Sequence, residues 1–207
     1  PSPFATPQFR DGQFLVQDPT ALAAAEAVPC RPGDTVVDLC AAPGTKTTVL
    51  AERVAPGGMV WAFDPDPLRR VRITENVARL RLGEVVRVVG NVAELPVADA
   101  VLADVPCSNP GVLGRRVEVR RRLTAGGFAR LVAVQKELLA QAIGLGKPGG
   151  AVVYSTCSID REENEGVVEA VLATAGEGRC ELVRSERTLP QACVCDGGFF
   201  AVLKVTG

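Results

Sequence analysis

The sequence predicts an α/β domain whose seven-stranded, mostly parallel sheet is covered by helices on both faces. Short apolar, β-branched runs alternate with helical patterns along most of the 207 residues. Apolar residues make up 47% and charged residues 23%, a composition typical of a globular chain with a buried core. The last two strand-like runs have no helix between them, so one of them should run antiparallel in a hairpin at the sheet edge.

The first half of the chain is expected to supply four strands and three helices. Residues 1–18 are Pro-rich and irregular, and we expect a lead-in segment ahead of a domain at 19–207. Asp18 suits an N-cap and Pro19 the first helical position, so a helix should begin there and run to about Val28. Further helices are expected at 45–54 and 68–80, and strands at 35–40, 59–63, 85–89 and 100–104.

The second half continues the alternation after a loop at 107–123 that is rich in Gly and Arg. Helices are expected at 128–145 and 162–173, and strands at 151–155, 181–185 and 199–205, with a Gly149-Gly150 turn before the first of these strands. Ligands of open α/β sheets bind beyond the carboxyl ends of the strands. Residues that end the strands are therefore the candidates for a functional site.

Composition excludes several kinds of site. The chain has no histidine, which removes Ser–His–Asp and Cys–His catalysis and histidine-based zinc sites. Its net charge is −1, but 19 of its 23 basic residues are arginine, the side chain best suited to forked recognition of phosphate. The sequence has no apolar run of about 18 residues, so we expect no membrane span. Seven cysteines without CxxC spacing favour a reducing, cytoplasmic location and no metal site.

The loop after the first strand is a candidate cofactor site. Residues 38–46 read Asp-Leu-Cys-Ala-Ala-Pro-Gly-Thr-Lys, so small residues precede a helix N-terminus and let the backbone approach a ligand. Asp64 lies about 20 residues further on, where an acid can accept both hydroxyls of a ribose. The pattern predicts a nucleoside cofactor; NAD would need a diphosphate cradle, whereas S-adenosylmethionine has no phosphate. The alternative is that Asp64 only caps a turn.

Two cysteines follow strands at the predicted ligand edge. Cys107 comes after Asp104 and Pro106, and Cys157 follows the strand at 151–155. Thiolate is the one strong nucleophile left to a chain without histidine, and Lys46 can lower the pKa of a nearby thiol. Either cysteine taken alone could equally be a buried structural residue.

An arginine-rich segment follows Cys107 directly. Its five arginines are Arg115, Arg116, Arg120, Arg121 and Arg122. This position favours contact with nucleic-acid phosphates, although a solvated surface is the alternative. Few aromatic residues accompany the segment, so base stacking is not indicated.

Together these motifs resemble the Sun (RsmB/Fmu-type) family of RNA cytosine-5 methyltransferases, in the same order over nearly the whole chain. The matching segments lie at 14–18, 38–47, 104–108, 155–158, 162–165 and 198–201. The resemblance implies a Rossmann-like class I S-adenosylmethionine-dependent methyltransferase fold. It further implies methylation of carbon 5 of cytosine in RNA, with 16S ribosomal RNA as the expected substrate. We also expect the protein to be a monomer.

The resemblance also implies roles for individual residues. Cys157 would be the nucleophile that adds to carbon 6 of cytosine, and Cys107 would help to release the adduct. Asp104 would hold the cytosine edge or lie between cofactor and substrate, and Lys46 would contact the base or support Asp104. The implied cofactor-binding residues are Cys40, Ala41, Ala42, Pro43, Gly44, Thr45, Lys46, Asp64 for the ribose, Asn91 near the adenine, and Asp104.

The sequence departs from the family pattern at several positions, and other functions stay open. Asn91 stands where the family usually has Asp, which predicts weaker cofactor binding. Ser108-Asn109-Pro110-Gly111 replaces Ser-Gly/Ala-Thr-Gly, and Thr45 replaces a common second Gly. A non-catalytic RNA- or protein-binding module on the same fold is one alternative. A DNA cytosine methyltransferase is another, but the Thr-Cys-Ser motif speaks against it. Bacterial members usually carry RNA-binding sequence upstream, and we expect this domain to be absent here.

Overall fold

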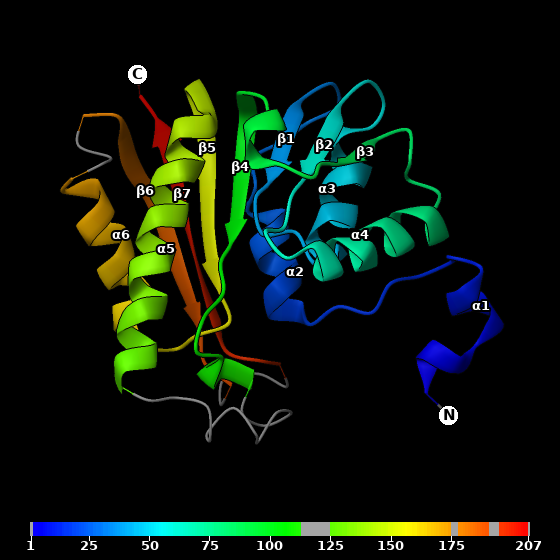
Figure 1. Cartoon of the computed structure of the whole chain (residues 1–207), viewed down its shortest axis with the longest axis horizontal. Helices are drawn as coiled ribbons and strands as arrows, with labels where there is room; N and C mark the ends of the chain where they lie inside the picture. The colour runs from blue at the N-terminus through cyan, green and yellow to red at the C-terminus, as the bar shows by residue number, and fades with distance from the viewer. Residues whose placement is uncertain (1, 113–124, 175–177, 191–194, 207) are drawn as a thin grey trace.

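A seven-stranded sheet forms the centre of the molecule (Figure 1). The computed structural model describes residues 2–112, 125–174, 178–190 and 195–206. The strand order is β3-β2-β1-β4-β5-β7-β6. The strands are β1 (Thr35–Asp38), β2 (Met59–Ala62), β3 (Val86–Val88), β4 (Ala98–Asp104), β5 (Gly146–Thr156), β6 (Cys180–Thr188) and β7 (Gly198–Val205).

The direction of the strands confirms the predicted edge hairpin. Strands β3, β2, β1, β4 and β5 pair in parallel, whereas β7 runs antiparallel to both of its neighbours. Strand β7 therefore lies inserted between β5 and the edge strand β6. The prediction of a mostly parallel α/β sheet is confirmed.

Helices cover both faces of the sheet (Figure 1). Helices α2 (Pro19–Glu26), α3 (Thr45–Val54) and α4 (Pro67–Arg79) pack against one face, where Val36 and Leu102 are buried. Helices α5 (Ala125–Leu145) and α6 (Glu165–Leu172) pack against the other, where Val37 and Val101 are buried. The alternation of neighbouring residues between the two cores is the period-two pattern of a strand. Among the described helices, none has the length and apolarity needed to cross a membrane.

Helix starts follow the signals in the sequence. The Asp18 carboxylate accepts a hydrogen bond from the Thr20 N–H at 3.0 Å, and Pro19 begins α2 as predicted. Asp66 caps α4 in the same way, with the Leu68 N–H at 2.8 Å. Each cap fixes the residue at which its helix begins. The starts of both helices help to form the walls of a cavity beyond the strand ends, described below.

Three local expectations were wrong. The lead-in segment contains a 3₁₀ turn (η1, Pro3–Ala5) and a short helix (α1, Pro7–Arg10), and Arg79 on α4 stacks 4.0 Å above the Phe9 ring. Strand β5 begins at Gly146 rather than residue 151, because Gly146 pairs with Ala98 before a register shift. The helix expected at 162–173 is interrupted at Asn164, between the 3₁₀ turn η5 (Arg161–Glu163) and α6. The division into segments 1–18 and 19–207 stays a prediction.

Candidate active site

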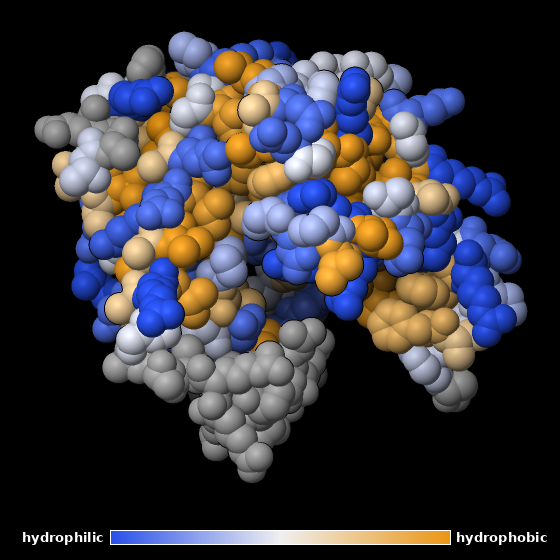
Figure 2. All heavy atoms as spheres, viewed as in Figure 1, coloured by the Kyte–Doolittle hydropathy of each residue, from blue (hydrophilic) through white to orange (hydrophobic). Residues whose placement is uncertain are grey.

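A cavity of about 1030 Å³ opens beyond the carboxyl ends of the central strands. Strands β1 and β4 are neighbours although β2 and β3 lie between them in sequence, so the cavity lies at the switch point of strand order. Cys40, Asp64, Asp104 and Cys157, which follow or end β1, β2, β4 and β5, all line it. Figure 2 shows a hollow in this part of the molecule, with hydrophilic residues visible inside it.

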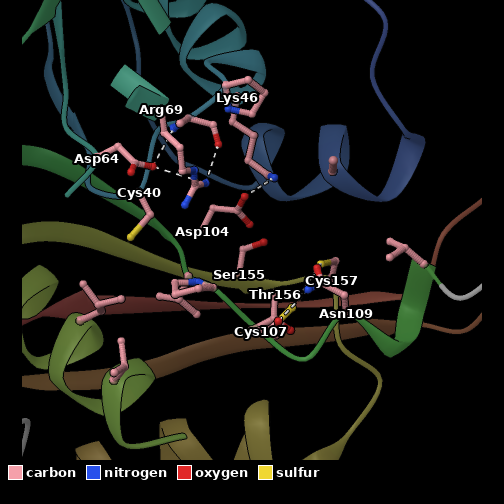
Figure 3. A pocket seen from close by; sticks show the side chains of 18 of the residues that line it. Cys40, Lys46, Asp64, Arg69, Asp104, Cys107, Asn109, Ser155, Thr156 and Cys157 are labelled. Atoms are coloured by element: carbon pink, nitrogen blue, oxygen red, sulfur yellow. Dashed lines mark hydrogen bonds and ion pairs between the residues drawn. The ribbon is translucent and has the colours of Figure 1, made fainter. Parts of the chain in front are cut away.

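The cofactor loop and Asp64 form one end of the cavity (Figure 3). The Asp64 carboxylate is fully buried and accepts hydrogen bonds from the backbone N–H groups of Ala42 at 3.3 Å and Asp66 at 3.1 Å. Arg69 lies 3.4 Å from the same carboxylate and also donates to the Ala42 carbonyl at 3.1 Å. Gly44 has a φ of +100°, a left-handed conformation that favours glycine at the turn into α3.

Asp38 is a buried acid that the sequence reasoning placed in the loop motif without assigning it a role. One carboxylate oxygen accepts a hydrogen bond from the Thr47 hydroxyl at 2.7 Å. The other, Oδ1, has no hydrogen-bond partner within the described residues. Burial raises the pKa of Asp38 to about 7. The signal available in the sequence was a lone acid at the end of a buried apolar strand.

These groups fit S-adenosylmethionine better than a dinucleotide. Asp64 lines the cavity and offers carboxylate oxygens for ribose hydroxyls, whereas Asp38 lies behind the loop and is not a lining residue. The wall beside Asp64 is formed by the small or apolar residues Cys40, Ala42 and Pro43. Such a wall suits a nucleoside and a short aliphatic chain, and it lacks the successive glycines of a diphosphate cradle.

Cys107 and Cys157 lie together at the other end of the cavity (Figure 3). Their Sγ atoms are 3.1 Å apart, and both thiols are free. Cys107 is buried, whereas Cys157 is partly exposed in the cavity. The hydrogen bond to Cys157, together with burial, raises the pKa of Cys107 well above its ordinary value. Cys107 is therefore a neutral thiol beside the more accessible Cys157.

Lys46 and Asp104 form an ion pair between the cofactor end and the two cysteines. Lys46 Nζ lies 2.6 Å from Asp104 Oδ2, and both residues line the cavity. Burial lowers the pKa of Lys46, but the Asp104 carboxylate outweighs it and holds that pKa above the ordinary value. Lys46 therefore remains cationic and in contact with Asp104.

A buried polar network holds the loop that carries Cys107. The Glu163 carboxylate is fully buried and accepts from the Ser108 N–H at 2.8 Å, the Ser108 hydroxyl and Gln135 Nε2 at 3.0 Å. Gln135 also donates to the Pro106 carbonyl at 3.0 Å. The sequence reasoning matched the segment around Glu163 to the family but assigned it no role. This network ties the loop after β4 to helix α5 and turn η5.

The structure brings most of the predicted site residues together. Those lining the cavity are Cys40, Ala42, Pro43, Lys46, Asp64, Asp104, Cys107 and Cys157. Ala41, Gly44 and Thr45 belong to the same loop and the start of α3 but are not lining residues. The Asn91 side chain instead caps the 3₁₀ turn η2 (Val92–Glu94), accepting from the Ala93 N–H at 3.0 Å. The roles assigned to these residues remain predictions.

Two further predictions concern other kinds of site. The candidate RNA-binding residues Arg115, Arg116, Arg120, Arg121 and Arg122 lie outside the described residues. Within the described part of the chain, no group of three or more Cys, Asp or Glu side chains is arranged to hold a metal ion.

Comparison with known proteins agrees with this geometry. A sequence model of the family "16S rRNA methyltransferase RsmB/F" matches residues 25–203. The chain is 36% identical over 202 residues to ribosomal RNA small subunit methyltransferase B of Proteus mirabilis, covering 95% of this chain and 47% of that protein. The chain thus spans about half the length of the curated relatives it matches.

Two solved structures share the fold closely. NSun6 from Pyrococcus horikoshii, solved with SFG, has a TM-score of 0.88 and 27% identity, over 100% of this chain and 57% of that one. A methyltransferase homologue from the same organism has a TM-score of 0.82 and 28% identity, over 98% and 72%. The family match covers most of the chain and agrees with the order of motifs and the cavity they line. The chain therefore belongs to the 16S rRNA methyltransferase RsmB/F family.

Proposed function

We propose that this chain is the catalytic domain of an enzyme that transfers a methyl group from S-adenosylmethionine to carbon 5 of a cytosine in RNA. The observation that carries the proposal is the approach of Cys157 to Cys107, 3.1 Å between sulfurs, in a cavity shared with the Lys46–Asp104 pair and the cofactor loop. One end of this cavity suits a nucleoside cofactor, and the other offers a nucleophile. SFG, the molecule in the NSun6 structure, is an analogue of S-adenosylmethionine, which supports this choice of cofactor.

Each residue of the cavity has its own role in the proposed reaction. The Cys157 thiolate adds to carbon 6 of cytosine, and the new S–C bond makes carbon 5 nucleophilic. Asp104, paired with Lys46, holds the polar edge of the base. S-adenosylmethionine would supply the electrophilic methyl group that carbon 5 accepts, and it would leave as S-adenosylhomocysteine. When carbon 5 then loses its proton to solvent, the S–C6 bond breaks and Cys157 leaves as thiolate, with Cys107 beside it to assist release.

The substrate and its contacts are a further part of the proposal. The curated relatives are named ribosomal RNA small subunit methyltransferases, which favours 16S ribosomal RNA and a cytoplasmic location. Arg72 lines the cavity and has no hydrogen-bond or ion-pair partner within the described residues, so it is available to a phosphate of the RNA strand. We propose that the domain acts without a metal and as a monomer.

Cysteine substitutions test the proposal directly. With labelled S-adenosylmethionine and 16S ribosomal RNA, Cys157→Ala should abolish methyl transfer, whereas Cys107→Ala should accumulate a covalent RNA–protein adduct. DNA of the same sequence serves as the matched acceptor. Full activity in both variants would overturn the proposal. Cofactor binding without methylation of any RNA would favour the non-catalytic module, and methylation of DNA alone would favour the DNA enzyme.

A further inference from the structure

Asn109 has an unusual backbone conformation and lies next to the two cysteines. Its φ is +61°, in the left-handed region that among non-glycine residues Asn and Asp tolerate best. Its side-chain Nδ2 donates to the Cys107 carbonyl at 2.7 Å. Because this bond requires the nitrogen on that side, it fixes the orientation of the carboxamide. The oxygen therefore faces away from the Cys107 carbonyl.

The Asn109 oxygen faces the sulfur atoms (Figure 3). Oδ1 accepts a hydrogen bond from Cys157 Sγ at 2.8 Å and lies 3.9 Å from Cys107 Sγ. The loop is also held by its backbone, since the Gly111 N–H donates to the Cys157 carbonyl at 3.1 Å. A Cβ at Gly111 would lie 2.6 Å from that carbonyl oxygen, so only glycine permits the approach. The contact between Asn109 and Cys157 is thus built into the packing of two loops.

The other charged and titratable groups near Cys157 also affect its thiol. Cys107 adjoins it as a neutral thiol, and Lys46 from α3 interacts with it electrostatically while paired with Asp104. Asp18 and Asp196 line other parts of the same cavity, from the start of α2 and the loop before β7. Glu163, from η5, is directed to Ser108 and Gln135. Asn109 therefore adds a neutral acceptor next to the nucleophile.

We propose that Asn109 is a catalytic residue that holds the Cys157 thiol through its carboxamide oxygen, keeps the resting nucleophile protonated, and so sets the pH at which the thiolate forms. An amide oxygen accepts from S–H but offers nothing to S⁻, so the bond exists only in the thiol form. The inference rests on the proposed function for the role of Cys157 as nucleophile. The family usually has glycine or alanine at this position, and the proposed role accounts for the asparagine found here.

Two substitutions separate this role from a structural one. Asn109→Gly keeps the left-handed backbone and removes the acceptor. Asn109→Asp keeps the backbone and the side-chain shape and replaces the neutral oxygen beside Cys157 with a charged one; like Asn109→Gly, it loses the Nδ2 hydrogen bond to the Cys107 carbonyl. Both residues suit a φ of +61°, so both variants are expected to fold, which thermal melting checks.

The measurement is the rate of iodoacetamide alkylation of Cys157 against pH, followed by mass spectrometry of its peptide so that Cys107 is scored separately. We expect the pH midpoint to fall by roughly half a unit to one unit in Asn109→Gly. It should rise by about one unit or more in Asn109→Asp, because a carboxylate disfavours a neighbouring thiolate. An unchanged or higher midpoint in Asn109→Gly, or a shift of both variants in one direction, overturns the proposal. No RNA is needed, so this failure would be distinct from failure of the methylation test.

Discussion

Lys46 Nζ lies 2.6 Å from Asp104 Oδ2, and this pair separates the cofactor loop from the two cysteines. Lys46 is largely buried. Replacing it with a neutral residue would therefore leave the Asp104 carboxylate without its positively charged partner. We expect Lys46→Met to lower methyl transfer by roughly 10- to 100-fold. Single-turnover methylation of RNA measures this loss.

Lys46→Arg is the control for the Lys46 substitution. It keeps the positive charge while changing the shape of the side chain, so it should retain more activity than Lys46→Met. Equal losses in the two variants would show that the packing of Lys46, and not its charge, supports the reaction.

Asp64 is expected to determine cofactor affinity. Replacing its carboxylate by the amide of Asn removes a charged acceptor for the ribose, and the Kd for S-adenosylmethionine should rise about 10- to 100-fold. Isothermal titration calorimetry measures this directly. Asp66→Asn is the matched control, because Asp66 caps α4 two residues away and Asn is an equally good cap. A similar loss of affinity in both variants would contradict the assignment of Asp64.

Asn91→Asp is expected to strengthen cofactor binding, by roughly three- to tenfold in Kd, because a charged acceptor makes a stronger hydrogen bond to an amino group. The fold should tolerate the change, since Asp can cap η2 as Asn91 does. Calorimetry with S-adenosylmethionine gives the affinity, and Asn91→Ala shows the effect of removing the acceptor. An affinity that is the same in parent and Asn91→Asp would count against a contact with adenine.

The sequence predicted those features that depend on local patterns. The Asp18-Pro19 helix start and the alternation of strands follow from capping and periodicity, and both are confirmed. The rule that strand ends meet at one edge correctly placed Asp64, Asp104, Cys107 and Cys157 in one cavity.

Features that depend on tertiary packing were missed. Strand β5 starts early because Gly146 pairs with Ala98, a contact between distant segments. Glu163 reaches Ser108 over 55 residues of sequence, and Asn109 reaches Cys157 over 48. No periodicity or spacing shows such contacts, because they depend on how side chains of different loops are directed after folding.

Glu163→Gln tests the network beneath the Cys107 loop. The neutral amide is a weaker acceptor for Ser108 and adds a donor facing Gln135, so the free energy of unfolding should fall by about 1–3 kcal/mol. Urea denaturation measures this change. Glu162→Gln, on the exposed neighbour, should change stability by less than about 0.5 kcal/mol. Equal effects of the two substitutions would contradict a special role of the buried carboxylate.

Asp38 is expected to make stability depend on pH between about 4 and 7. Its pKa rises from 3.8 in the unfolded chain to about 7 in the fold, so the native state binds more protons than the unfolded state in this window. The contribution of Asp38 to stability is therefore fully present below about pH 4 and is lost as the pH rises through 7. The upper limit of this loss is roughly 4 kcal/mol.

Asp38→Asn isolates this contribution, because Asn has no charge to bury and its oxygen can still accept from Thr47. We expect the free energy of unfolding to fall less between pH 4 and 7 in Asp38→Asn than in the parent, as measured by urea denaturation at several pH values. Titration of other groups contributes equally to both proteins and cancels in the difference. Parallel stability curves for the two proteins would show that Asp38 is already ionised in the native state throughout this range.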